Sequence, residues 1–168
     1  MNRVIETDFK MKKEWIEMFP YGLAVGANGS RPVMIFKDKN EEKVLPVWLS
    51  PLDSAIAVSQ SGGSITDSSP HNLTQKMLDN LEIKLEKCFF TELKGHHQFL
   101  RLEFSGNDKL TELESRADEA ISFCLNADCR FFCRRDFIDK CRIMDAELEM
   151  PLNMDMTVTT ENDRPYLN

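Results

Sequence analysis

The sequence predicts an α+β protein with a single sheet, mostly antiparallel or mixed, and helices packed on it. Short segments of alternating apolar residues come in pairs, and a segment with helical spacing follows each pair. The pattern Ser-x-x-Asp-x-Ala-Ile also occurs twice, beginning at Ser50 and at Ser115, both times after a pair of predicted strands. We therefore predict that the fold is built from a duplicated strand–strand–helix unit.

Hydrophobic period, turn residues and helix caps predict the individual elements. Residues 15–24 are apolar, and Pro20 in their middle predicts an edge strand or a bulge. Ser50 and Pro51 are typical of a helix start, and Gly62 with Gly63 predicts its end. The helix at 72–81 places Leu73, Met77, Leu78 and Leu81 on one face. The other predicted strands are 33–36, 44–49, 83–93, 99–104, 110–115 and 131–132, and the other helices are 116–126 and 134–140.

Length and composition predict one compact domain with an extension at each end. The chain has 168 residues, of which 42% are hydrophobic and 29% charged. We expect a leader at residues 1–14, a domain at 15–144 and an acidic, mobile tail at 145–168. No apolar segment approaches the ~20 residues of a membrane span, and acids stand where a signal peptide would be apolar. A cytoplasmic location without a membrane partner is therefore expected.

Charge and cysteine content narrow the function. The net charge of −7 lowers the expectation of tight nucleic-acid binding, which usually depends on Lys and Arg neutralising phosphates. Arg130, Arg134 and Arg135 surround a Phe pair in the one aromatic and basic cluster, and we expect this pair to belong to a core strand. The five cysteines contain no Cys-x-x-Cys pair, which favours buried thiols over a disulfide framework, a zinc site or an iron–sulfur site.

Three motifs resemble the bifunctional nuclease domain family. Residues 45–49, Leu-Pro-Val-Trp-Leu, are similar to the family's Leu-Pro-Ile-Trp-Ile-Gly, and Asp53 matches the acid of the following helix. Residues 69–73, Ser-Pro-His-Asn-Leu, keep the His and Leu of Arg-Pro-Leu-Thr-His-Asp-Leu-Leu. Residues 114–121 are similar to Asp-x-Arg-Pro-Ser-Asp-Ala-Ile, and 130–133 match the family's last apolar strand. The resemblance spans about residues 20–140 and implies cleavage of both DNA and RNA.

The resemblance and side-chain chemistry together define the candidate site. Phosphodiester cleavage needs an activated water, a cation on the phosphate and a proton for the leaving oxygen. We predict that His71, Arg116 and Glu119 are catalytic and converge on one cleft, with His71 transferring the proton and Arg116 binding phosphate. Asp118 and Glu119 would hold Mg²⁺ or Mn²⁺ through their carboxylates. The remaining candidates are Asp53 and Asn72.

Each candidate also has a structural interpretation. Asp53 and Asp118 stand three residues after a serine, the spacing of a capping box. Asn72, where the family has Asp, would cap its helix without supplying a charge, and Arg116 with Glu119 would form an ion pair. Three functions therefore stay open. They are a metal-assisted nuclease of low sequence specificity, a catalytically inactive regulatory or ligand-binding module of the same fold, and a structural or interaction protein whose acidic tail recruits a partner.

A homo-oligomer is also expected. A sheet built from two short repeats leaves edge strands that need to be covered, and symmetric dimers are the commonest assemblies. The apolar strands at residues 99–104 and 131–132 are the predicted contributors.

Overall fold

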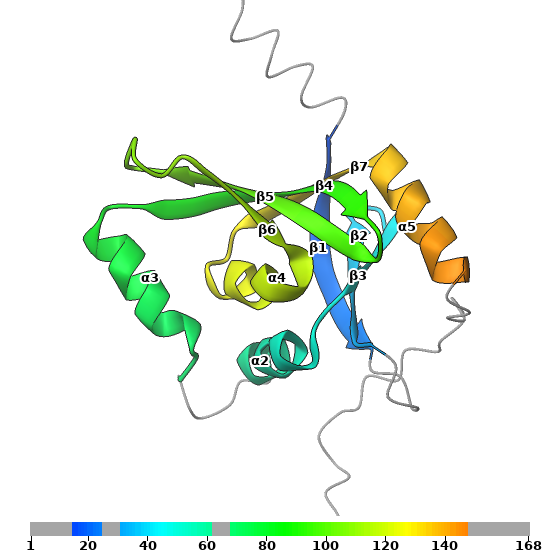
Figure 1. The fold of residues 1–168 in the computed structure, drawn as a ribbon, viewed down its shortest axis with the longest axis horizontal. Helices are drawn as coiled ribbons and strands as arrows, with labels where there is room; N and C mark the ends of the chain where they lie inside the picture. Colours follow the sequence, from blue (N-terminus) through cyan, green and yellow to red (C-terminus); the bar gives the residue numbers. More distant parts are fainter. Residues whose placement is uncertain (1–14, 25–30, 62–67, 148–168) are drawn as a thin grey trace, which may run out of the picture.

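A seven-stranded mixed sheet organises the molecule (Figure 1). The computed structural model describes residues 15–24, 31–61 and 68–147, so the predicted leader and the chain beyond 147 lie outside the described residues. The strands are β1 (Trp15–Ala24), β2 (Val33–Asp38), β3 (Val44–Trp48), β4 (Lys84–Lys94), β5 (His97–Ser105), β6 (Glu112–Arg116) and β7 (Arg130–Arg134). The helices are α2 (Pro51–Ser61), α3 (His71–Asn80), α4 (Ala117–Asn126) and α5 (Arg135–Glu147). The predicted α+β fold with a single sheet is confirmed.

The sheet places two three-stranded meanders on either side of β7. The strand order is β3-β2-β1-β7-β4-β5-β6, and each neighbouring pair is antiparallel except β4 and β7. The first meander leads directly into α2 and the second into α4, as the strand–strand–helix pattern predicts. The two helices pack against each other below the sheet in Figure 1. The duplication of the unit stays a prediction.

Two strand positions differ from the sequence-based expectation. β1 carries the bulge predicted from Pro20, with a register shift between Pro20 and Gly22, but it lies between β2 and β7 and is not an edge. The apolar strands predicted to contribute to an oligomer, β5 and β7, are also interior. The edges of the described sheet are β3 and β6, and oligomerisation stays a prediction. α5 continues past the predicted domain end at 144, to Glu147.

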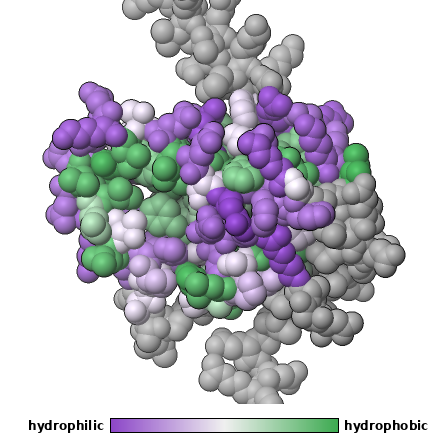
Figure 2. All heavy atoms as spheres, viewed as in Figure 1, coloured by the Kyte–Doolittle hydropathy of each residue, from purple (hydrophilic) through white to green (hydrophobic). Residues whose placement is uncertain are grey.

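Helix α3 stands apart from the other helices at one end of the molecule (Figure 1). None of its residues is buried. The apolar face predicted from helical spacing is present, but Leu73, Met77 and the following Leu81 are exposed, and Leu78 alone of the four is half-buried. Figure 2 shows hydrophobic surface gathered over this end of the molecule. None of the described helices is long and apolar enough to cross a membrane.

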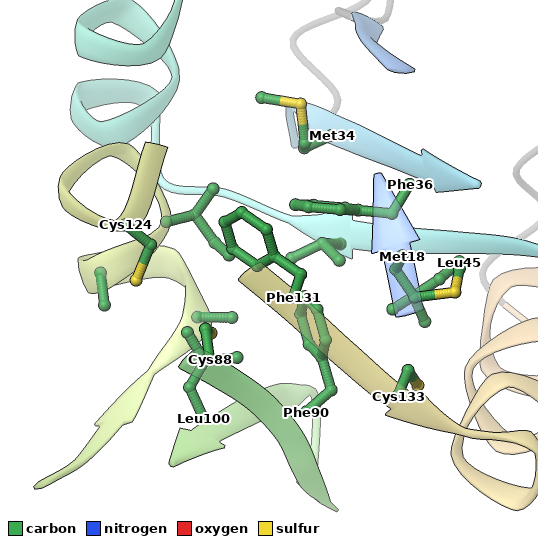
Figure 3. Packing of buried hydrophobic residues seen from close by; sticks show 14 of the residues in the cluster. Met18, Met34, Phe36, Leu45, Cys88, Phe90, Leu100, Cys124, Phe131 and Cys133 are labelled. Atoms are coloured by element: carbon green, nitrogen blue, oxygen red, sulfur yellow. The ribbon is translucent and has the colours of Figure 1, made fainter. Parts of the chain in front are cut away.

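The main core lies between the sheet and helices α4 and α5 (Figure 3). Phe36 is at its centre, with ring centroids 4.9 Å from Phe131 and 5.4 Å from Phe90. All five cysteines are free and buried, and Cys88, Cys124 and Cys133 can be seen in this cluster, as expected for thiols used as small hydrophobic side chains. Burial also raises the pKa of Cys133, which is consistent with an unreactive thiol.

The Phe pair of β7 divides between the two faces of the sheet. Phe131 enters the core as predicted, whereas Phe132 stacks on Phe89 on the other face, with centroids 5.1 Å apart. The Arg130 guanidinium lies 5.0 Å from the Phe132 ring and also pairs with Glu17 at 2.8 Å. Since this cation is already paired, the aromatic and basic cluster supplies less charge for phosphate than its sequence suggests.

Gln98 joins β5 to the outer edge of β3. Its buried side chain donates from Nε2 to the Pro46 carbonyl at 2.8 Å and accepts the Trp48 N–H at 3.0 Å. These two strands are far apart in the strand order, so the sheet must curl to bring them within side-chain reach. The curl wraps the sheet around α4 and α5.

Candidate functional site

The contact between α2 and α4 buries a carboxylate against a hydroxyl group. Asp53 of α2 and Ser122 of α4 are both buried. The Ser122 hydroxyl donates to one Asp53 oxygen, and the Ser122 N–H donates to the other at 3.3 Å. Ser50 caps α2 as predicted, since its Oγ accepts the Asp53 N–H at 3.0 Å. The Asp53 carboxylate, however, accepts the hydroxyl and N–H of Ser122 instead of completing a capping box.

His71 extends this contact to α3. Its Nε2 lies 2.7 Å from Ser122 Oγ, and its ring meets the Phe123 ring edge-on at 5.6 Å between centroids. A hydrogen-bonded chain therefore runs from Asp53 through Ser122 to His71, across three helices. Sequence reasoning missed Ser122. The sequence feature that could have identified Ser122 is its position. It is a polar residue inside the apolar stretch 120–125 of a predicted helix, one turn after Asp118.

When Asp53 is ionised, the hydrogen-bonded chain determines the tautomer of His71. Ser122 has a single hydroxyl proton, and an ionised Asp53 takes it as a hydrogen bond. His71 must then donate its Nε2–H to Ser122 Oγ, so the lone pair of the neutral ring lies on Nδ1. A ring held in this way is suited to accept a proton at Nδ1.

Burial shifts the two titratable groups of this chain in opposite directions. It raises the pKa of Asp53 above its usual value, against the hydrogen bonds from Ser122 and the charge of His71. It lowers the pKa of His71, against the opposing charge of Asp53. Both shifts favour the neutral form of each group, as expected when water is removed from a charge. His71 is therefore neutral at pH 7.

The lowered pKa of His71 makes stability depend on pH. The unfolded chain binds a proton at His71 below about pH 6.5, whereas the folded chain binds it only at lower pH, so the free energy of unfolding falls as pH drops below about 6.5. The raised pKa of Asp53 has the opposite effect. From about pH 3.8 upward the folded chain holds this proton more tightly than the unfolded chain, so this group contributes stability that is lost as the pH rises. We expect His71→Gln to lose less stability than the wild type between about pH 7.5 and 5.5 in urea denaturation. The exposed His96→Gln is the control, and equal losses in all three proteins would contradict the expectation.

A second group of charges begins one turn earlier on α4. The buried Asp118 carboxylate accepts Nε and Nη2 of Arg116 at 2.9 and 2.6 Å, and Nη2 of Arg31 at 2.6 Å. Burial acts to raise the pKa of Asp118, but the hydrogen bonds and charge of Arg116, and then the charge of Arg31, hold it below its usual value. α4 has Arg116 at its N-cap without a side-chain cap, so the predicted capping role of Asp118 is wrong.

Arg31 is the second residue that sequence reasoning missed. It stands just before β2, and its side chain also donates to the Leu49 carbonyl at 3.3 Å and the His96 carbonyl at 3.2 Å. These bonds hold its guanidinium at the meeting point of three segments. The sequence offers little to reveal it, because Asp118 lies 87 positions away.

Two of the candidate catalytic residues contact side chains of α4, at two neighbouring positions of that helix. Arg116 meets Asp118, and His71 meets Ser122, four residues or about 6 Å further along the helix axis. Glu119 is 61% exposed at its side chain and lies 3.8 Å from Arg116, which is the ion pair considered above. Among the described residues, no hydrogen bond or ion pair joins His71 directly to Arg116 or Glu119.

The start of α3 is set by Ser69. Its Oγ accepts the His71 N–H at 3.2 Å, and the helix begins at His71 with Pro70 in the N-cap position. Asn72 is therefore the second residue of the helix and not its cap.

The carboxylates near Arg116 do not fit a divalent cation in this arrangement. Both Asp118 oxygens already accept arginine N–H groups, and two guanidinium charges would repel a metal ion there. The part of the chain that the structure describes contains no group of three or more His, Cys, Asp and Glu placed to hold a metal.

A curled mixed sheet with a polar site between its helices defines the class, a single-sheet α+β domain. A family model described as the bifunctional nuclease domain matches residues 34–146. This range covers more than half of the chain, so the chain belongs to the bifunctional nuclease domain family. None of the curated proteins matches it significantly. Asp53, His71, Arg116 and Ser122 lie inside the matched range, and Arg31 lies just before it.

Proposed function

We propose that this domain hydrolyses phosphodiester bonds in DNA and RNA with low sequence specificity. One observation carries the proposal: a neutral histidine, oriented through Ser122 by a buried carboxylate, lies one helical turn from a pair of arginines. A general base and a phosphate-binding cation are two of the groups that the reaction requires. Family membership supports the same activity.

His71 acts as the general base. Nδ1 takes a proton from water as the water oxygen bonds to phosphorus, and the bond between phosphorus and the leaving oxygen breaks. The leaving oxygen then takes a proton from solvent. Ser122 keeps the ring in place, and the Asp53 charge stabilises the imidazolium that forms.

Arg116 and Arg31 bind the phosphate. Together with Asp118 they carry a net charge of about +1, since two guanidinium groups face one carboxylate. The side chains of Arg31 and Arg116 are 33% and 38% exposed, so N–H donors that Asp118 does not use can face a ligand. Asp118 orients the two groups, and Glu119 holds the outer nitrogen of Arg116. Recognition of the phosphate without contacts to bases accounts for cleavage of both nucleic acids.

The experiment compares supercoiled plasmid, single-stranded DNA and RNA as substrates of the purified full chain, in EDTA, Mg²⁺ and Mn²⁺. We expect cleavage of DNA and RNA. Cleavage in EDTA supports hydrolysis by the chain's own residues. Cleavage only with Mg²⁺ or Mn²⁺ would mean that a metal ion takes part in the reaction, and Glu119→Gln then tests whether Glu119 binds it.

The alternative is a catalytically inactive ligand-binding module of the same fold. The observation that favours it is Asp118, whose carboxylate occupies the two arginines much as a phosphate would. Binding of single-stranded DNA or RNA without cleavage under all three conditions would support this alternative and overturn the hydrolase.

Arg116→Lys tests the phosphate contact. Lysine keeps the charge but loses the planar pair of donors, so we expect kcat/KM for cleavage to fall by about 10- to 100-fold, mainly through KM. Arg130→Lys is the matched control, because Arg130 also pairs with a carboxylate but lies on β7 outside the site. Equal effects of the two substitutions would contradict the assignment of Arg116.

A further inference from the structure

A histidine beside the two arginines has no part in the reaction proposed above. His97 is the first residue of β5, and its Nδ1 lies 3.8 Å from Oδ2 of Asp118. This nitrogen is buried and has no hydrogen-bond partner within the described chain, although 43% of the side chain is exposed. Buried polar atoms without a partner are rare in folded proteins, so the position of this ring calls for an explanation.

The register of the sheet brings His97 to Asp118. β5 and β6 are antiparallel, and Phe99 pairs with Arg116 at the end of β6. Continued by two residues, the same register places His97 opposite Asp118, where the chain passes from β6 into α4. The contact therefore follows from the strand pairing and does not depend on a loop.

The hairpin end that carries His97 is also fixed to the arginines. Nη1 of Arg31 donates to the carbonyl of the preceding residue, His96, at 3.2 Å, and Nη2 of the same side chain donates to Asp118 at 2.6 Å. His97 is thus held at the rim of the group of charges that would bind phosphate.

Asp118 orients the ring through Nδ1. The distance of 3.8 Å is longer than a hydrogen bond, but catalytic hydrogen bonds are often long until a substrate is bound. Burial acts to raise the pKa of Asp118, and the two arginines and then the charge of a protonated His97 lower it. Since Nδ1 is buried against the carboxylate, the exposed part of the ring is the side that carries Nε2.

The two histidines contact α4 one helical turn apart. His97 lies beside Asp118, and His71 lies beside Ser122, about 6 Å further along the helix axis. Side chains four residues apart are neighbours on one face of a helix. In a displacement at phosphorus the attacking and leaving oxygens are roughly in line with the phosphorus between them. A separation of this order leaves room for one phosphate between a base and an acid.

We propose that His97 is the general acid of the reaction and donates its Nε2 proton to the oxygen that leaves phosphorus. The proposal rests on the proposed function and replaces solvent as the source of this proton. As the bond from phosphorus to the leaving oxygen breaks, its electron pair passes to that oxygen, which takes the proton from Nε2. His97 is left neutral and regains a proton from solvent, and His71 returns to solvent the proton that it took from water.

A change of leaving group tests this role. The substrate is a single-stranded DNA oligonucleotide with one phosphodiester among uncleavable methylphosphonate linkages. Its matched partner carries sulfur in place of the leaving oxygen, which the ends of the wild-type products identify. A thiolate is far less basic than an alkoxide, so it leaves without a proton and makes a general acid unnecessary. Both substrates are cleaved by the full chain under the condition, EDTA or metal ion, in which the wild type is active.

His97→Gln is expected to lower kcat for the oxygen substrate by about 10²- to 10⁴-fold and to change kcat for the sulfur substrate by less than about threefold. His71→Gln should slow both substrates alike, because the attack of water needs a base whichever group leaves. His96→Gln is the matched control, since the side chain of this neighbouring histidine is exposed and should affect neither substrate.

The wild type gives a second measurement that depends on no variant. With an acid in place, sulfur should raise kcat by less than about tenfold, whereas a site without an acid should gain about 10²- to 10⁴-fold.

The outcomes separate the general acid from the nuclease assignment. Equal losses of His97→Gln on the two substrates, or no loss on the oxygen substrate, overturn the role of His97 and leave the proposed function intact. A gain of more than about 10²-fold from sulfur in the wild type does the same. A wild type that cleaves neither substrate removes the proposed function and the general acid with it.

Discussion

Replacing His71 with glutamine is expected to lower the rate constant for phosphodiester cleavage by about 10²- to 10⁴-fold, the usual contribution of general acid–base catalysis. Glutamine keeps a polar group within reach of Ser122 but cannot accept the proton from water. His71 takes part in proton transfer and not in phosphate binding. The substitution should therefore lower kcat far more than it changes KM. Steady-state cleavage of a single-stranded substrate measures both constants.

His96→Gln is the control for this experiment, because His96 is an exposed histidine outside the hydrogen-bonded chain. Ser122→Ala adds a test of positioning. Without its hydroxyl group the ring loses its anchor, and the pH at which the rate is half-maximal should change together with the rate. A His71→Gln variant that retains more than about one-tenth of the wild-type kcat, with unchanged thermal stability, would remove His71 from the mechanism.

Gly106→Ala should produce the largest loss of stability from a single methyl group. Gly106 has a φ of 97°, and an added Cβ would lie 1.8 Å from the backbone oxygen of Glu82. Glu82 itself has a positive φ of 58°, so neither backbone segment yields without further strain. We expect the free energy of unfolding to fall by about 3–5 kcal/mol, in the range of severe substitutions.

Gly95→Ala separates the cost of backbone strain at a positive φ from the cost of steric overlap of the added Cβ. Gly95 also has a positive φ, of 58°, but no heavy atom lies within 4 Å of the added Cβ. Only backbone strain remains, and the expected loss is about 1–2 kcal/mol. Urea denaturation of both variants measures the difference. Equal losses would mean that the β4–α3 junction moves aside at little cost.

Local patterns predicted most of the fold. The alternation in residues 99–104 correctly predicted β5, and the Ser-Pro pair at Ser50 correctly predicted the start of α2. Both predictions succeeded because strand alternation and helix caps depend on neighbouring residues. Pro20 predicted the bulge but not the interior place of β1, which depends on strand order. The exposure of Met77 was equally beyond local reasoning, since helical spacing identifies a face and not what covers it.

The candidate site was predicted less completely. Its ends, His71 and Arg116, were found from the resemblance, and their convergence in one cleft stays a prediction. Asp53 was also a candidate, but Ser122, which joins it to His71, was not found. Ser122 and Asp53 are 69 positions apart and are brought together only when α2 packs on α4. The capping explanation of Asp118 failed because the Asp118 carboxylate accepts N–H groups of Arg116 and of Arg31, and Arg31 comes from a distant segment.

The amide of Gln98 has a consequence for behaviour at high concentration. An edge strand normally offers its unused N–H and C=O groups to any other extended chain, which is how sheets grow into fibrils. On β3 the Trp48 N–H and the Pro46 carbonyl are already bound by Gln98, and proline has no N–H to offer. β6, the other edge of the described sheet, is only five residues long and carries Glu112 and Glu114, whose like charges would face a second copy. Strand addition is thus blocked by an amide side chain at one edge of the described sheet and opposed by charge at the other.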